Sequence, residues 1–190
     1  MKNLFINLFV ALLFTGSLYA NDVYVTQSGN TLDLDITQDG QNNTVGNSTT
    51  ASTVTGATTT LDIDQVGNSN VLTFDVNGAT YTGTFNVNGN SNNIDFNCDS
   101  TGNNSSCGTV TSSITFTGSS NDIDLDVGQT ADASNFTGTI TGASGSDSNV
   151  IAATVDGTSA ILTISVNGDT NNWLIDIDGN GDINLSLIHI

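Results

Sequence analysis

The chain has 190 residues and a formal net charge of −18 at pH 7, because 19 acidic residues, all of them Asp, stand against one basic residue, Lys2. Lys2 lies in the expected signal peptide, so the mature chain has no cationic side chain with which to neutralise phosphates. Nucleic acid is therefore excluded as a partner, and so is an anionic membrane surface. Proline is absent and Gly, Asn, Ser and Thr are abundant, a composition typical of β-strands joined by Gly and Asn turns.

Residues 1–20 have the pattern of a bacterial secretory signal peptide. Lys2 precedes an apolar run from Leu4 to Phe14, and small residues lead to Ala20. The run is too short to span a membrane, so we expect cleavage after Ala20 and no integral membrane segment afterwards. This pattern predicts a protein that is secreted, or held at the surface of a bacterium. Residues 21–184 are expected to form a single domain, because their length suits one domain and no Pro-rich or charged linker suggests a second.

The tetrapeptide "GNSN" occurs at 67–70 and again at 89–92, and a looser Gly-x-x-Asn pattern recurs along the chain. A stretched version runs from Gly142 to Asn149. The Asn residues at 43, 70, 92, 121, 149 and 171 are 27, 22, 29, 28 and 22 positions apart, which indicates a repeat architecture. The Gly-x-x-Asn pairs are Gly40 and Asn43, Gly67 and Asn70, Gly89 and Asn92, Gly118 and Asn121, and Gly168 and Asn171.

The residues on either side of each pair alternate as in a half-buried strand. Apolar side chains stand two, four and six positions beyond each Asn, as in Leu72, Phe74 and Val76, and on the same parity before each Gly. Only the first unit departs, with Val45, Asn47 and Thr49. The positions between hold carboxylates that must point outward: Asp33, Asp35, Asp62, Asp64, Asp95, Asp122, Asp124, Asp126, Asp176 and Asp178.

Each unit is therefore predicted to be a strand, a tight turn and a second strand, with one apolar face that is too small to be stable alone. Stacking about six or seven such units would bury that face, which predicts an all-β solenoid over residues 21–184. The parity places the turn Asn residues, together with Gln38 and Gln65, on the inward side, where each amide can bond to its equivalent one coil along. The Gly is expected to supply the backbone freedom that the corner needs.

The segments "QDGQNN" at 38–43 and "QVGNSN" at 65–70 fit Gln-x-Gly-x-x-Asn, and "QSGNT" at 27–31 begins the same way. This pattern resembles the curlin repeat family, the subunits of curli fibres. The resemblance implies an extracellular functional amyloid of the biofilm matrix that self-associates into fibres, with a nucleator subunit and an outer-membrane export machinery as partners. The Gln is replaced from Phe85 onward, and the later repeats are longer and uneven.

Cys98 and Cys107 bracket the polar loop "DSTGNNSS". An even pair of cysteines in an exported chain predicts a disulfide, because the compartment is oxidising. Neither a C-x-x-C spacing nor a nearby His suggests zinc.

The stretch "DIDGNGDIN" at 176–184 matches the start of an EF-hand type calcium loop, with side-chain oxygens at Asp176, Asp178, Asn180 and Asp182. The alternative is that Asp176 and Asp178 are ordinary outward residues of the repeat, and the bidentate Glu that closes such a loop is missing. Calcium is the one ligand that the sequence suggests, and no other cofactor is expected.

Thr-x-Thr segments resemble the flat threonine ladders of ice-binding β-solenoids. They occur at Thr82 and Thr84, at Thr115 and Thr117, and at Thr137, Thr139 and Thr141. We interpret them instead as ordinary exposed strand residues, because the pairs do not recur in every unit at one position.

The last six residues, "LSLIHI", are what the end sequence of a transposon used to fragment DNA for sequencing libraries encodes. Leu185 to Ile190 are therefore expected to be non-native, and His189 carries no functional argument. Without His189 the mature chain has no His or Lys to act as a base, and its Asp residues recur along the repeat instead of converging, so no catalytic residues are expected.

These features together predict a secreted structural protein, a curli-like fibre subunit or biofilm matrix component. The alternative is a non-polymerising surface adhesin of the same fold that binds calcium, and a third hypothesis is an ice-binding protein.

Overall fold

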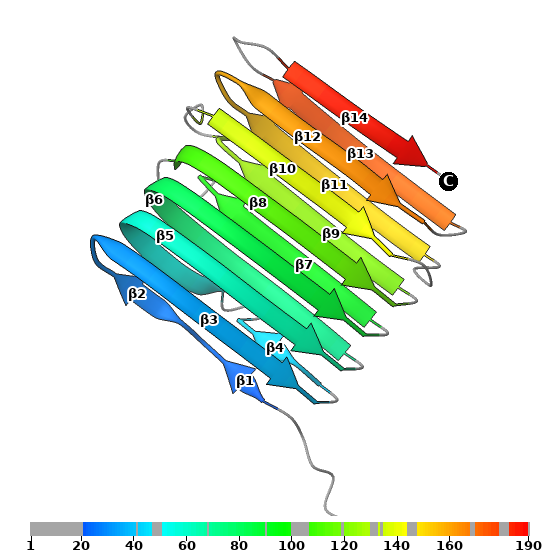
Figure 1. Cartoon of the computed structure of the whole chain (residues 1–190), viewed down its shortest axis with the longest axis horizontal. Coiled ribbons are helices and arrows are strands. Elements are labelled where there is room, and N and C mark those ends of the chain that lie inside the picture. The colour runs from blue at the N-terminus through cyan, green and yellow to red at the C-terminus, as the bar shows by residue number, and fades with distance from the viewer. Residues whose placement is uncertain are drawn as a thin grey trace, which may run out of the picture.

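The computed structural model describes residues 21–40, 42–46, 51–67, 69–89, 91–99, 107–118, 120–129, 133, 135–143, 148–167, 170–178 and 183–189. Every regular element within these residues is a β-strand, and every strand pairing is parallel. The strands wind into coils that stack along one axis, with residues 21–46 at one end of the stack and residues 170–189 at the other (Figure 1). The predicted all-β solenoid is thus confirmed.

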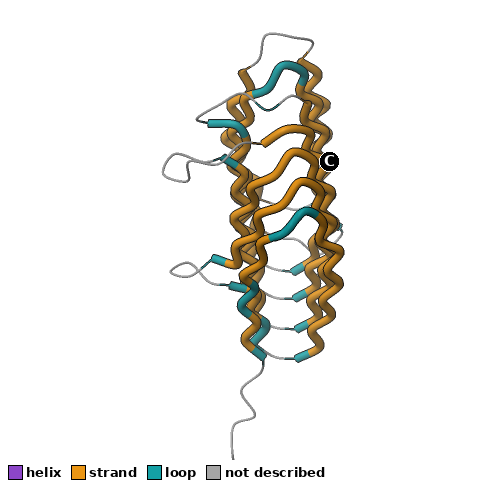
Figure 2. The backbone as a smooth tube through the Cα atoms, turned by 90° about the vertical axis from the view of Figure 1, so that its left-hand side faces the viewer, coloured by secondary structure: helices purple, strands orange, loops and turns teal. Residues whose placement is uncertain are grey.

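Each coil contributes one segment to each of two facing layers, which Figure 2 shows as two separate stacks. Layer 1 holds the first half of each coil and layer 2 the second half. Because β5 (Ser52–Val66) and β6 (Ser69–Asn88) run around the corner between the layers, the two layers form one continuous sheet. Layer 1 otherwise contains β1 (Asp22–Val23), β2 (Thr26–Ser28), β4 (Thr44–Val45), β7 (Ser91–Cys98), β9 (Ser120–Val127), β11 (Ser148–Asp156) and β13 (Thr170–Asp178). Layer 2 contains β3 (Thr31–Asp39), β8 (Cys107–Thr117), β10 (Asn135–Gly142), β12 (Ala160–Val166) and β14 (Ile183–His189).

The strand register follows the spacing of the Asn residues. In layer 1, Ser69 lies beside Ser91, Ser91 beside Ser120, and Ser120 beside Ser148, which are steps of 22, 29 and 28 residues. The same steps separate Asn70, Asn92, Asn121 and Asn149 in the sequence. The recurring turn therefore does mark equivalent positions of successive coils.

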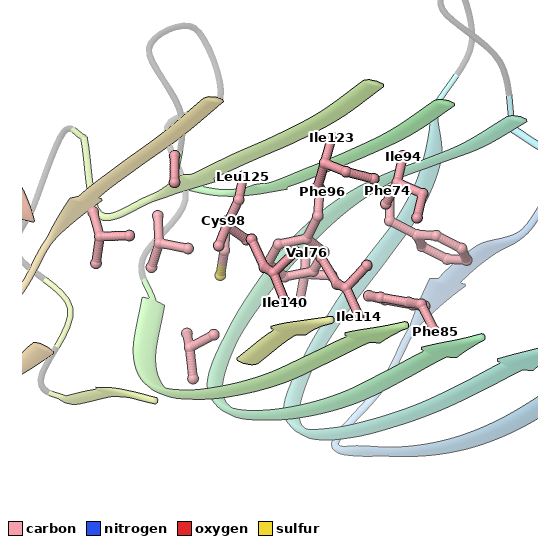
Figure 3. Packing of buried hydrophobic residues seen from close by; sticks show 14 of the residues in the cluster. Phe74, Val76, Phe85, Ile94, Phe96, Cys98, Ile114, Ile123, Leu125 and Ile140 are labelled. Atoms are coloured by element: carbon pink, nitrogen blue, oxygen red, sulfur yellow. The ribbon is translucent and has the colours of Figure 1, made fainter. Parts of the chain in front are cut away.

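The inward side chains form one apolar core between the layers (Figure 3). The residues predicted to face inward in the middle coils are buried, and Val45 of the irregular first unit is buried as well. The predicted outward Asp residues are exposed or half-buried, so the parity prediction is confirmed on both sides. Full burial of a large apolar side chain contributes about 1.5 to 3 kcal/mol, so this core is the main stabilising term.

Aromatic rings from both layers meet in the core. Phe85 of layer 2 lies with its ring centroid 6.3 Å from that of Phe74 and 6.0 Å from that of Phe96, both in layer 1. The ring of Tyr81 stacks on Phe96 at 4.8 Å and lies over Gly83, where an added Cβ would stand 1.8 Å from the Tyr81 hydroxyl oxygen. A large side chain is thus accommodated by a glycine two residues along the same strand.

The predicted disulfide joins the two layers within one coil. Cys98 ends β7 and Cys107 begins β8, and their Cα atoms are 5.9 Å apart. Both cysteines are buried at the edge of the core. The bridge closes the polar loop between them, so a long connection does not loosen the coil.

The segment 185–189, predicted to be non-native, lies within β14, which pairs with β12 from Ile183 beside Ala160 to His189 beside Val166. The pairing does not test the origin of the segment, which stays a prediction.

Candidate functional site

The corner formed by the Gly-x-x-Asn turns carries a ladder of buried amides. Asn70 donates from Nδ2 to Oδ1 of Asn43 at 2.9 Å, and Asn92 donates to Asn70 at 2.6 Å. Farther along, Asn121 donates to Asn149 at 3.0 Å, and Asn149 donates to Asn171 at 2.7 Å. The predicted ladder of turn Asn residues is confirmed, and its members lie in the register that the spacing implied.

The ladder changes direction in its middle. The donors of Asn70 and Asn92 point to the preceding coil, whereas those of Asn121 and Asn149 point to the following coil. As a result Asn92 and Asn121, which are register partners, each keep a buried Oδ1 atom without a hydrogen bond. A buried acceptor without a donor costs about 1 to 3 kcal/mol, so this step is the weakest in the ladder.

A second, shorter ladder runs beside the first. Gln65 donates from Nε2 to Oε1 of Gln38 at 2.7 Å, and Gln38 donates to the carbonyl oxygen of Thr44 at 2.9 Å. The next position in the column is Val87, so the buried Oε1 of Gln65 has no partner. The predicted pairing of the two Gln side chains is therefore confirmed, and it ends where the sequence loses its Gln.

The turn glycines form a column at the same corner. A Cβ built at Gly67 would lie 1.6 Å from the carbonyl oxygen of Gly40, and one at Gly89 would lie 1.9 Å from that of Gly67. Among the described glycines a positive φ occurs at Gly46, Gly118 and Gly128. The expectation that the corner needs glycine for backbone freedom is therefore wrong at Gly67 and Gly89, where the reason is the close approach of the previous coil. Gly118, with φ of 136°, does need that freedom.

Gly142 and Gly168 were also predicted to begin turns. Gly142 instead pairs with Phe116 and Val166 inside the strand ladder and is buried, so it is a core residue and not the start of a stretched turn. Gly168 lies outside the described residues.

Glycines also line the opposite corner, which the Gly-x-x-Asn pattern did not predict. Gly56 and Gly78 are register partners there, and a Cβ at Gly78 would lie 2.2 Å from the carbonyl oxygen of Gly56. The signal was present as the repeated tripeptide Gly-Ala-Thr at 56–58 and 78–80.

The outer surface of layer 1 carries closely spaced carboxylates, which we call the aspartate face: Asp75, Asp95, Asp122, Asp124 and Asp126. Asp95 lies directly beside Asp124 in the ladder. Partial desolvation, and then repulsion from Asp126, Asp95 and Asp122, raise the pKa of the Asp124 carboxyl to about 6. Desolvation likewise raises the pKa values of Asp75, Asp95 and Asp126. Hydrogen bonds oppose part of this rise, since Asn97 donates to Asp95 at 2.7 Å and so lowers the pKa of the Asp95 carboxyl.

The outer surface of layer 2 carries aligned hydroxyl side chains instead. The register places Thr82 beside Thr111 and Thr111 beside Thr137. As predicted, the Thr residues do not recur in every unit at one position, because Asp33 and Ile161 stand at the two ends of this column. In the middle coils, however, the register aligns Thr residues whose correspondence the unequal repeat lengths hide in the sequence. We call this surface the threonine face, and its columns are Thr58, Thr80 and Thr109; Thr60, Thr82, Thr111 and Thr137; Thr84, Ser113, Thr139 and Thr163; and Thr115, Thr141 and Ser165.

The predicted calcium loop is only partly described. Asp176 and Asp178 lie exposed on the outer side of β13, as the repeat alone requires, while Asn180 and Asp182 lie outside the described residues. Within the described part of the chain no group of three or more His, Cys, Asp or Glu residues is placed to hold a metal ion. Calcium binding at 176–182 stays a prediction.

Comparison of the chain with protein-family models, with curated proteins and with solved structures finds no match. In the described residues no helix is long and apolar enough to cross a membrane. The curlin resemblance therefore rests on the repeat itself.

Proposed function

We propose that this chain is an exported structural protein whose copies stack end to end into fibres, as a curli-like subunit of an extracellular matrix. A nucleator subunit and an outer-membrane export machinery belong to the same proposal as partners. The observation that supports it most is that β3 and β13 leave both apolar side chains and a strand edge uncovered.

At the first coil, the inward residues Leu32, Leu34 and Ile36 are only partly buried, whereas Leu61 and Ile63 of the next coil are 1% and 0% exposed. The inward residues of β13, the last strand of layer 1 that the structure describes, are partly buried as well: Trp173, Ile175 and Ile177. Among the described residues, β3 and β13 thus each leave an apolar edge that a further coil would cover.

The backbone at these ends is also open. In the described pairings β3 is bonded only to β5, and β13 only to β11. A parallel edge strand presents a row of free N–H and C=O groups, which is a template for another chain. Because all the strands run parallel, the last coil of one copy can pair with the first coil of the next and continue the same ladders.

The net charge of −18 opposes this association. Copies stacked end to end bring their carboxylates within a few ångströms of the junction, and salt shortens the range of this repulsion to about 10 Å at 0.1 M. Assembly is therefore expected to be faster at higher ionic strength. It should also be faster in millimolar calcium than in the presence of a chelator.

The test uses the secreted chain after signal removal. Purified protein should form unbranched fibres with a meridional reflection near 4.8 Å, bind amyloid dyes, and grow faster from fibre seeds. Ile36→Lys places a charge on the inward edge of the first coil, so it should keep a folded monomer and abolish growth. Thr37→Lys is the matched control, because its side chain points outward from the same strand.

A chain that stays monomeric at every salt and protein concentration would overturn the fibre proposal and favour the non-polymerising adhesin. Equal fibre growth by the Ile36→Lys and Thr37→Lys variants would also contradict it, because growth would then not use the solenoid ends.

A further inference from the structure

From β6 to β12 the threonine face is an uncharged area on a strongly charged molecule. On layer 2 the described carboxylates are confined to β3 and β5, at Asp33, Asp35, Asp39, Asp62 and Asp64. From β6 to β12 the outward positions of this layer hold Thr, Ser, Asn and one Ile. A partner of this surface is therefore not recognised by charge.

Aromatic recognition is absent from the same area. The aromatic residues of layer 2 from β6 to β10 all point inward and are at most 1% exposed: Tyr81, Phe85, Phe116 and Phe136. Without an outward ring there is no platform on which a sugar could stack. What remains is an array of methyl groups and hydroxyl groups.

This array is regular in two directions. Neighbouring coils place equivalent residues about 4.8 Å apart, and residues two positions apart on one strand are separated by about 6.6 to 6.8 Å. Thr is β-branched and has few accessible χ1 rotamers in a strand, so its hydroxyl and methyl groups are held in place before any partner arrives. Thr82, Thr84, Thr111, Thr137 and Thr139 occupy adjacent points of this lattice.

A lattice of weak, identical groups binds strongly only when the partner is itself a lattice, because an irregular ligand can engage only a few of the points. The partner must also be neutral and able to accept and donate hydrogen bonds. We propose that the threonine face binds ice, with the hydroxyl groups bonded into an ordered layer of water and the methyl groups set between them.

A second copy of the chain is the main competing occupant. Two threonine faces packed together would lie about 10 Å apart. Each molecule carries a net charge of −18, and such packing would gain side-chain contacts without the backbone ladder that end-to-end stacking provides. The charge therefore favours a neutral partner over a second copy at this face.

The experiment measures thermal hysteresis and inhibition of ice recrystallisation by the secreted chain. It is run on the Ile36→Lys variant as well, so that failure of fibre growth and failure of ice binding are separate results. Thr111→Tyr with Thr137→Tyr inserts two bulky rings at register partners in the middle of the array. This double variant should keep the β circular dichroism and melting temperature and lose both ice activities.

The matched control is Val150→Tyr with Asn172→Tyr, which are exposed register partners on the outer side of layer 1. It should keep both ice activities. The proposal is overturned if the unaltered chain has neither activity, or if the two double variants behave alike. Two other results would assign the threonine face to a different partner if ice activity is absent. One is a dimer in sedimentation, and the other is binding to crystalline polysaccharide, in each case abolished by the Thr111 and Thr137 changes.

Discussion

The two corners of the solenoid differ in how much variation they accept. At the corner of the Gly-x-x-Asn turns the described connections are short and the amides of successive coils are bonded to one another. At the opposite corner β5 and β6 run straight through, while later coils carry the disulfide loop after Cys98 and the connection from Val127 to Asn135.

The difference shows where register is determined. A buried amide must find its partner one coil along, so a shift of one residue at the Asn corner would cost several hydrogen bonds at once. The opposite corner has no described ladder of this kind, and it can absorb inserted residues. The coils therefore keep one alignment although their lengths vary from 22 to 29 residues.

The largest loss of stability is expected from crowding the recurring glycine column of the Asn corner. Gly67→Val would place a Cβ 1.6 Å from the backbone carbonyl oxygen of Gly40, which cannot move without separating two coils. Chemical denaturation should show a loss of at least about 3 kcal/mol, or no folded protein.

Gly29→Val is the control in the first coil, where no described coil precedes the glycine. Its new Cβ would meet only the flexible amide end of Gln27 at 3.2 Å, so a change below about 1 kcal/mol is expected. Equal losses in the two variants would contradict the claim that contact with the preceding coil is what makes glycine necessary at position 67.

Removal of one ladder amide should cause the next largest loss of stability. Asn70→Ala leaves the Oδ1 of Asn43 without its donor and the Nδ2 of Asn92 without its acceptor, so we expect a loss of about 2 to 4 kcal/mol by denaturation. Asn93→Ala removes the same side chain from the outward side one residue after the ladder, and it should cost less than about 0.5 kcal/mol. If Asn70→Ala lost as little stability as Asn93→Ala, the ladder amides would not determine the register.

Removing the disulfide tests the opposite corner, which accepts inserted residues. Cys98→Ala with Cys107→Ala releases a loop with a sequence separation of 9, and the chain-entropy relation gives a loss of about 2 to 3 kcal/mol. The protein should melt earlier but keep its β spectrum and its Asn register, because the amide ladder is untouched. Loss of the native spectrum would show that this corner is also needed to align the coils.

The smallest effect is a dependence of stability on acidic pH, which the carboxylates of the outer surface supply. The ladder amides do not titrate, whereas the folded protein raises the pKa of Asp124 to about 6 from an ordinary 3.8. Between these values the folded state binds more protons than the unfolded state, so stability from this group is highest below pH 4 and falls as pH rises to about 6.

Melting temperature measured across this range should therefore fall, and Asp124→Asn should flatten the curve and raise the melting temperature at pH 7. Asp33→Asn, on layer 2 beside Thr60, serves as the control. A curve that Asp124→Asn leaves unchanged would contradict the assignment to the aspartate face.

Much of the fold could be predicted because its local signals repeat. The Gly-x-x-Asn spacing predicted the layer 1 register, and the alternation around Leu72, Phe74 and Val76 predicted which side chains face the core. Both signals are local in the chain and are copied from coil to coil, so no knowledge of distant contacts was needed.

The other features could not be predicted, because they depend on the coil lengths and side-chain orientations of the folded chain. The threonine columns align only once the unequal coil lengths are known, as when Thr111 lies 29 residues after Thr82 but 26 before Thr137. The reversal between Asn92 and Asn121 depends on amide orientation, which the residue type does not specify. The second corner is marked by only two clear copies of Gly-Ala-Thr, at 56–58 and 78–80, too few to stand out.

The most direct test of the stacked coils is a set of spin-label distances along one outward column. Asp33, Thr60, Thr82, Thr111, Thr137 and Ile161 follow one another on adjacent strands. Labels replacing Asp33 and Ile161 should therefore stand about 24 Å apart, and labels at Asp33 and Thr137 about 19 Å, each with a narrow distribution, since every strand step adds about 4.8 Å. Broad distributions, or distances that do not grow by one strand step per coil, would contradict the stacked solenoid and with it both proposals.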